Sequence, residues 1–271
     1  MDKISYVGNA DVNAIEHLYN QYKQDPTNVD LSWQKFFGTM EKHISSQFDA
    51  DLTNVSSRVL ELGGLVESQT RQAVYALAQF SMEAANQVIA TERQVNILEV
   101  EIDAELASII ARRQPTARDL RLLMAISKIT GNLERAGDEA ERIARMVKQI
   151  LEQGSPRNLP SSELRIASDL ASGLLRKALD AFARLDVNTA LVILKEDDLI
   201  DAEFNGFVRK LITYMMEDPR TISASLDLLF VAKAIERIGD HAKNIAEFVI
   251  YVVKGADVRH TALTDIEKAV K

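Results

Sequence analysis

The sequence LERAGDEAERIA, residues 133–144, returns as IERIGDHAKNIA at residues 235–246, and seven of the twelve positions are identical. Both copies lie in helix-forming sequence, so Glu134 with Asp138, and Glu236 with Asp240, fall four residues apart on one helical face. Like charges at this spacing destabilise an exposed helix by roughly 0.2–0.5 kcal/mol. The glycine before each aspartate costs a further ~1 kcal/mol relative to alanine. Because both unfavourable features occur twice, we expect this repeated phrase to serve a function.

The repeated phrase lies near the end of a helical pattern that also occurs twice. Apolar residues spaced three and four apart predict helices at about 52–77, 84–113 and 116–153, and again at 164–182, 187–216 and 219–253. Pro115 separates two of them, Thr116 with Asp119 resembles a capping box, and Gly255 ends the last helix before a polar tail. The segment 154–162, GSPRNLPSS, has the composition of a linker.

The expected fold is therefore all-α, because helices joined by short connections pack as antiparallel neighbours. We predict two tandem antiparallel three-helix bundles, at residues 40–153 and 163–271, joined by the linker at 154–162. A short helical N-terminal leader, residues 1–39, precedes them.

The leader differs from the rest of the chain, since it is rich in aromatic residues and contains Trp33, the single tryptophan. Its pattern predicts a helix at 12–23 opened by Asp11, a turn at DPTNVD, and a short helix at 32–37. The leader resembles the extreme N-terminus of the thiamine-dependent subunit of 2-oxoglutarate dehydrogenase, where YVxxLYxxYxxDPxxVDxxW marks a docking segment. It is interpreted as a fused segment, with Met40 as a second start, or alternatively as an ordinary amphipathic helix.

Composition excludes several functional classes. The chain has 271 residues, 46% hydrophobic and 27% charged, with no cysteine, so disulfides and thiolate metal sites are excluded. No apolar run is long enough to span a bilayer. A formal net charge of −8 argues against non-specific binding to nucleic acid or anionic membranes. These features suit a cytoplasmic protein that gathers carboxylates.

A second acidic stripe precedes each copy of the repeated phrase. Asp197 and Asp201 form another pair four residues apart, and the equivalent place in the first half has Glu92 and Asn96, with Glu99 and Asp103 continuing the stripe. If consecutive helices lie side by side, these carboxylates converge, which is unfavourable unless cations lie among them. Hard or borderline divalent ions such as Mg²⁺, Mn²⁺, Ca²⁺ or iron prefer such oxygen ligands.

The predicted metal ligands are six carboxylates, Glu134, Asp138, Glu236, Asp240, Asp197 and Asp201. Because Asn96 replaces an acid in the first half, we expect the site that contains Asp240 to bind metal preferentially. The alternative is a solvated helical surface with ion pairs at Asp138–Arg142 and Arg135–Glu139. His241 is expected to face solvent rather than bind metal.

No catalytic constellation is present in the sequence. The four histidines are scattered, and nucleophile-elbow, P-loop and dinucleotide patterns are absent. We therefore do not expect an enzyme.

From about Met40 onward the chain resembles the bacterial PhoU family. The LERAGD and IERIGD phrases carry the resemblance, together with other motifs in family order, among them ARRQPTARDLRLLMAISK at 111–128 and YMMEDPRTI at 214–222. The resemblance implies the same six-helix fold. It also implies clusters of iron or other divalent ions on the E/DxxxD pairs, which here are the six carboxylates named above.

The resemblance further implies a negative regulator of the phosphate regulon. Such a protein couples the ATPase subunit of a phosphate ABC transporter to a phosphate-sensing histidine kinase, as a homodimer in the cytoplasm. A purely structural helical scaffold or fusion protein, whose acidic pairs are solvated surface, is the alternative hypothesis.

Overall fold

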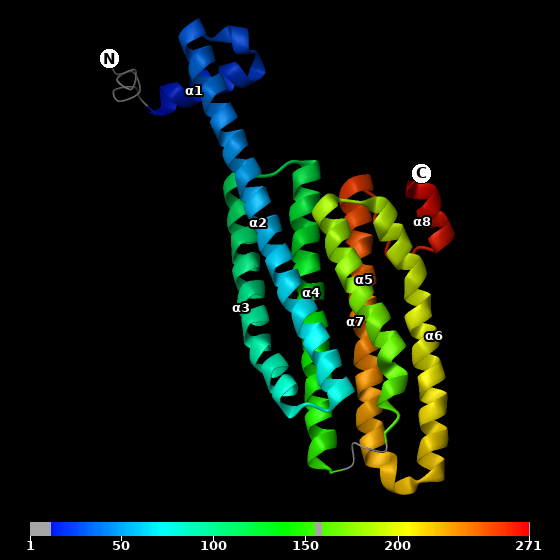
Figure 1. The fold of residues 1–271 in the computed structure, drawn as a ribbon. Coiled ribbons are helices and arrows are strands. Elements are labelled where there is room, and N and C mark those ends of the chain that lie inside the picture. Colours follow the sequence, from blue (N-terminus) through cyan, green and yellow to red (C-terminus); the bar gives the residue numbers. More distant parts are fainter. Residues whose placement is uncertain (1–11, 155–158, 271) are drawn as a thin grey trace. The chain divides into compact units, whose positions relative to one another are not determined.

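The computed structural model describes residues 12–154 and 159–270 of the chain (Figure 1). Its residues divide into two compact units, 1–53 and 54–271. Within the described ranges all regular structure is helical, as predicted.

The first unit contains α1 (Val12–Gln24), the short 3₁₀ helix η1 (Pro26–Asn28) and the beginning of α2 (Leu31–Gln79). Its core is a cluster of aromatic rings around Phe37, which is only 1% exposed. The Phe37 ring centroid lies 5.1 Å from Tyr19, 5.3 Å from both Tyr22 and Trp33, and 5.5 Å from Phe36. Ring pairs at such distances contribute about 0.5–1.5 kcal/mol each beyond the area they bury.

One expectation about the leader is wrong. The short helix expected at 32–37 is only the first part of α2, which continues without interruption through residue 39. It continues because no proline follows Leu31 within α2, and Gly38 alone costs too little to end a helix. The proposed cap residue Asp11 lies outside the described residues.

The second unit contains the rest of α2 and the helices that follow it, as predicted from the doubled pattern. The other bounds are α3 (Met82–Arg113), α4 (Ala117–Glu152), η3 (Ser161–Leu164), α5 (Arg165–Arg184), α6 (Val187–Glu217), η4 (Pro219–Thr221), α7 (Ile222–Lys254) and α8 (Leu263–Val270). Helices α2, α3 and α4 form the first three-helix bundle, and α5, α6 and α7 form the second (Figure 1).

Two details at the helix ends differ from expectation. Thr116 is the N-cap residue of α4, but its side chain makes no capping hydrogen bond, so the expected capping box does not form. The tail after Gly255 is not simply polar. It forms α8, which packs on α6 and α7, buries Ile266 to 3% exposure, and pairs Glu267 with Lys195 of α6.

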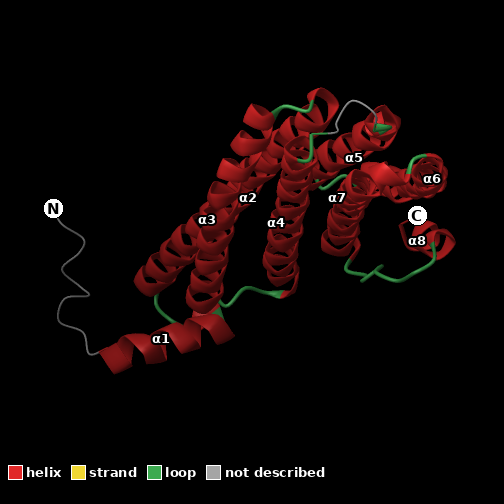
Figure 2. Cartoon of the chain, turned by 90° about the horizontal axis from the view of Figure 1, so that it is seen from below, coloured by secondary structure: helices red, strands yellow, loops and turns green. Residues whose placement is uncertain are grey.

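Helices α4 and α7, which carry the repeated phrase, lie against each other along the junction of the two bundles (Figures 1 and 2). The identical alanine and isoleucine positions of the phrase are fully buried there, and they are Ala140, Ile143 and Ala144 in α4 and Ala242, Ile245 and Ala246 in α7. The small side chains of the four alanines let the two helix backbones approach closely, and the two isoleucines fill the core beside them. One face of the phrase therefore builds the core, and its other face is left for the carboxylates.

Candidate functional site

The repeated phrase meets the preceding helix of its own bundle through its glycine. A Cβ atom on Gly137 would lie 3.3 Å from Glu92 Oε2 and 3.3 Å from Val95 of α3. A Cβ atom on Gly239 would lie 3.7 Å from Asp197 Oδ1 and 2.6 Å from Ile200 Cδ1 of α6. Glu92 and Asp197 thus occupy equivalent positions, as the sequence alignment predicts, and each glycine admits a side chain of the neighbouring helix.

In the first bundle the acidic stripes of α3 and α4 face each other. Burial, together with the negative charges of Asp138, Glu99 and Glu92, raises the pKa of Glu134 to about 7. The pKa of Glu92, Glu99 and Asp138 is also raised, in each case chiefly by burial and then by neighbouring carboxylates. Within the described residues none of these four acids forms an ion pair. The charges of Arg135 and Arg142 act in the opposite direction on Glu99, Glu134 and Asp138, but they offset the shifts only in part.

Glu92 accepts a hydrogen bond from a residue of α2, the first helix of the bundle. The predicted site did not include this residue. The Gln69 amide of α2 donates to Glu92 Oε2 at 2.7 Å, and Gln69 and Glu92 are only 2% and 5% exposed. In the described part of the chain Gln69 Oε1 and Glu92 Oε1 have no hydrogen-bond partner. Gln69 lies at a core-facing position of the apolar pattern, and a polar amide there is the signal that could have revealed it.

In the second bundle Asp197, Asp201, Glu236 and Asp240 influence one another electrostatically. Burial, and then the charges of Glu236, Asp197 and Asp201, raise the pKa of Asp240 to about 6. The pKa of Asp201 is raised by burial and by Asp197 and Glu236. These shifts show that the acidic pairs of α6 and α7 lie within electrostatic range of one another.

Two lysines enter the second acidic set. Lys243 Nζ lies 2.7 Å from Asp197 Oδ2, and Lys233 Nζ lies 2.6 Å from Glu236 Oε1. Burial lowers the pKa of Lys243, but the hydrogen bond and charge of Asp197 outweigh burial and raise it. Glu236 still has one buried oxygen, Oε2, without a partner among the described residues. This set is therefore partly neutralised by the protein itself.

The carboxylates do not form a ready-made coordination shell. In the described ranges, no group of three or more acidic or histidine side chains is arranged so that it could hold a metal ion. Repulsion between like charges keeps carboxylates apart. A cation would have to draw them together by rotation of their side chains.

The ion pairs expected for a solvated surface do not form either. Arg142 contacts Glu139 at 3.5 Å instead of Asp138, and the other partner of Glu139 is Arg237 of α7, at 2.9 Å, instead of Arg135. His241 does not face solvent as expected. Its Nδ1 atom lies 3.1 Å from Asn132 Oδ1 of α4, and burial followed by the charges of Arg135 and Arg237 lowers its pKa to about 4.

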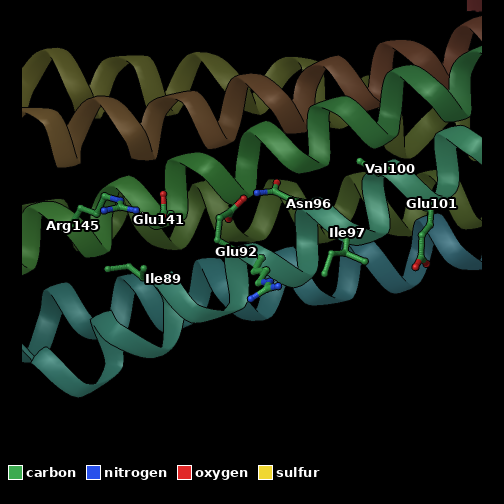
Figure 3. A pocket seen from close by; sticks show the side chains of 9 residues that line it. Ile89, Glu92, Asn96, Ile97, Val100, Glu101, Glu141 and Arg145 are labelled. Carbon is green, nitrogen blue, oxygen red and sulfur yellow. Dashed lines mark hydrogen bonds and ion pairs between the residues drawn. The ribbon is translucent and has the colours of Figure 1, made fainter.

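A groove of about 600 Å³ lies between α3 and α4, and Glu92 is the residue of the first acidic face that lines it. Figure 3 shows Glu92 directed from α3 toward α4, with Asn96 beside it and Glu141 and Arg145 approaching from α4. The remaining lining is largely apolar and comes from α3, with Ile89, Ile97 and Val100. The groove thus gives solvent access to Glu92, Glu101 and Glu141, and Arg93 lines it together with Arg145.

Fold and site together define a helical protein of two repeated bundles, each with a carboxylate-lined face. None of the described helices is long and apolar enough to cross a membrane. The sequence model of the PhoU domain matches residues 59–147 and 164–249. The chain belongs to the PhoU family, whose members are accessory and regulatory proteins and not enzymes.

Curated relatives match most of the chain. A protein from a Burkholderia species, named phosphate-specific transport system accessory protein PhoU homolog, is 51% identical over 222 residues, which cover 82% of this chain and 94% of the relative. The phosphate-specific transport system accessory protein PhoU of Escherichia coli (strain K12) is 44% identical over 229 residues, 84% of this chain and 94% of that protein.

Solved structures show the same fold. The crystal structure of PhoU from Pseudomonas aeruginosa superposes with a TM-score of 0.74 at 47% identity, covering 77% of this chain and all of that chain. The phosphate transport system regulatory protein PhoU from Streptococcus pneumoniae superposes with a TM-score of 0.72 at 28% identity, covering 78% and 99% of the two chains.

The leader is similar to a different protein family from the rest of the chain. Residues 5–43 match the sequence model of the 2-oxoglutarate dehydrogenase N-terminus. The resemblance read from the leader's motif is confirmed, and the chain joins sequences typical of two families.

Proposed function

We propose that the protein is a negative regulator of the phosphate regulon that binds divalent cations on its acidic helix faces. It acts in the cytoplasm as a homodimeric adaptor between the ATPase subunit of a phosphate ABC transporter and a phosphate-sensing histidine kinase. The main support is the 51% identity, over 82% of the chain, to a phosphate-specific transport accessory protein. The doubled acidic faces support the cation-binding part.

An adaptor role agrees with the outer surface of the second unit. Several large apolar side chains remain exposed there, among them Met216 at 78%, Val100 at 66% and Phe230 at 53%. Contiguous exposed apolar patches are typical of contact with other proteins, and single exposed apolar side chains are compatible with such a role.

The acidic residues fit a hard divalent ion. In the first bundle Glu92 retains a buried oxygen without a partner among the described residues. Burial, and then the negative charges of its neighbours, raise the pKa of Glu134 to about 7. A bound cation supplies the missing positive charge and so stabilises the ionised carboxylates. Glu134, Asp138, Glu236, Asp240, Asp197 and Asp201 are the residues we propose to hold such ions.

Deletion of the gene in its host tests the regulatory part. We expect phosphate-starvation genes, followed by a transcriptional reporter, to be expressed constitutively in phosphate-replete medium. Complementation with the intact gene should restore repression. Normal repression in the deletion strain would contradict the proposal.

A structural scaffold without bound metal is the second candidate, favoured by the lysine pairs of Asp197 and Glu236. Alanine substitution of Glu134, Asp138, Glu236 and Asp240 separates the two candidates. The proposed function predicts loss of divalent metal in elemental analysis and loss of repression in the host. Unchanged metal content and unchanged repression would favour the scaffold.

A further inference from the structure

A row of basic residues follows one edge of α4. Its members are spaced seven residues apart and are Arg121, Lys128, Arg135 and Arg142. Seven residues are almost two full turns of an α-helix, so these side chains leave α4 on nearly the same side. The equivalent positions of α7 hold one basic residue, Arg237. A chain with a formal net charge of −8 thus gathers positive charge on one edge of one helix.

The middle of this row borders a hollow at the junction of the two bundles. The hollow has a volume of about 360 Å³ and is lined by residues of α3, α4, α7 and the loop that follows α7. Sites for small molecules typically begin at about 300 Å³. The hollow is therefore large enough to admit a small organic molecule.

Two cations of the row enter this hollow without an internal partner. Lys128 and Arg135 line it and are exposed, and within the described ranges neither side chain forms an ion pair or a hydrogen bond. Burial, and then the charges of Arg135 and Arg237, lower the pKa of the neighbouring His241 to about 4, as a positive local potential does. The two cations can thus bind a ligand without breaking a contact of the folded chain.

A third cation of the hollow is held in place by its neighbours. The Arg259 guanidinium donates to Asp257 through Nε at 2.9 Å and Nη2 at 2.5 Å, and its Cζ lies 5.5 Å from the centroid of the Phe248 ring. A guanidinium has five N–H donors, so donors remain for a second acceptor. Asp257 balances the charge of Arg259, which therefore offers oriented donors, and a group oriented in advance loses less entropy on binding.

The opposite wall of the hollow is acidic, and its floor is polar. Glu99 and Asp103 of α3 form the acidic wall. In the floor, the Asn132 amide oxygen lies 3.1 Å from His241 Nδ1 and accepts from Asn244 Nδ2 at 3.0 Å. Ionised carboxylates repel an anionic group and accept hydrogen bonds from hydroxyl groups. A ligand that suits both walls has an anionic end and a hydroxyl-bearing end.

We propose that this hollow binds a phosphate monoester that also carries hydroxyl groups, such as a sugar phosphate or a nucleotide. The phosphoryl group contacts Lys128, Arg135 and Arg259, because ammonium and guanidinium groups suit its several oxygens. The hydroxyl groups donate to Glu99 and Asp103. An inorganic phosphate ion would fill only part of the hollow and would be repelled by the acids. The proposal goes beyond the proposed function and does not depend on a bound metal.

Calorimetric titration of the full-length chain tests the proposal. Glucose 6-phosphate and AMP are the two probes, and they distinguish a sugar phosphate from a nucleotide as the ligand. EDTA is present, so that no metal ion bridges a phosphoryl group to the acids. We expect at least one probe to bind, and inorganic phosphate, glucose and adenosine to bind about tenfold more weakly or not at all, because each lacks one of the two ends.

Replacement of the unpaired cations tests the phosphoryl contacts. Lys128→Gln and Arg135→Gln should each weaken binding of the monoester about tenfold or more, since each removes a hydrogen bond between charged groups. Both side chains are exposed, so we expect both variants to fold, and circular dichroism checks this. Arg209→Gln, which removes an exposed arginine of α6, is the matched control and should leave binding unchanged.

Asp103→Ala tests the acidic wall, because it should act on two ligands in opposite directions. The monoester should bind more weakly, since a hydroxyl group loses its acceptor, and inorganic phosphate should bind more tightly, since a negative charge is removed.

Three outcomes would each overturn the proposal. They are no binding of either monoester, binding that Lys128→Gln and Arg135→Gln leave unchanged, and inorganic phosphate that binds as tightly as the monoesters. None of them bears on the regulatory role, which deletion of the gene tests separately.

Discussion

Glu134 shows how a single residue links the acidic face to stability. Its pKa in the folded protein is about 7, against an ordinary value of 4.5, because burial and neighbouring acids oppose its ionisation. Between these two values the folded state holds a proton that the unfolded state has released. Stability therefore falls as the pH rises through this window, and it is not regained above it.

Glu134→Gln mimics the protonated acid and tests this linkage. Without divalent ions, we expect the variant to melt at a higher temperature than the unaltered protein at pH 8, and to differ much less at pH 4.5. Thermal unfolding followed by circular dichroism in the presence of EDTA measures the difference. The exposed Glu61→Gln change should have little effect at either pH, and an equal effect of Glu134→Gln at both would refute the linkage.

The two adjacent glycines of α2 show how one helix is fitted against another. A Cβ atom on Gly63 would lie 2.2 Å from Leu179 Cδ2 of α5, whereas nothing lies within 4 Å of a Cβ atom on Gly64. Both glycines interrupt a helix interior and cost the same intrinsic helix propensity. Only Gly63 is required by packing.

Alanine at the two positions should therefore have opposite effects. Gly64→Ala is expected to raise the free energy of unfolding by about 0.5–1 kcal/mol, the usual gain in helix propensity. Gly63→Ala must displace Leu179 and is expected to lower it by about 1–3 kcal/mol, as overpacking does. Urea denaturation of both variants measures this, and a gain for Gly63→Ala equal to that for Gly64→Ala would show that the contact does not matter.

Within the second unit, the two bundles are held in register by a polar contact between α4 and α7. Arg237 Nη1 lies 2.9 Å from Glu139 Oε1, and the Glu139 side chain is 5% exposed. The apolar junction around it is non-directional, whereas this pair has a defined geometry. Arg142 contacts Glu139 less closely, at 3.5 Å.

Arg237→Ala should leave Glu139 with only the weaker partner. We expect a loss of about 1–3 kcal/mol in the free energy of unfolding, typical of a hydrogen bond to a charged group. Arg209→Ala, which removes an exposed arginine of α6, is the matched control. In a double-mutant cycle with Glu139→Gln the effects should be non-additive, and simple additivity would exclude a direct coupling.

The helices were predictable because their signals are local. Apolar spacing marks each long helix, and Pro115, Asp186, Asp218 and Gly255 lie at or beside helix ends in the structure. The aromatic leader was predicted less well. The amphipathic pattern shows that residues 32–37 are helical, but no local signal says that the helix continues to Gln79.

The acidic site was predictable only in part. The repeat aligned Glu92 with Asp197 and placed the six carboxylates on helical faces, and the glycine contacts confirm that alignment. The partners of these carboxylates were not evident. Lys243 reaches Asp197 across 46 positions, and Gln69 reaches Glu92 across 23.

The helices were predictable and the partners of the carboxylates were not, because the two depend on interactions of different range along the chain. Helix formation and helix ends depend on residues within a few positions of one another, so the amino-acid order alone specifies six long helices and the acidic stripes along them. Which charges compensate each other depends on the rotation and register of packed helices. Packing therefore decided that lysines contact the acids of the second bundle and that Glu92 is buried, without a full set of partners, in the first.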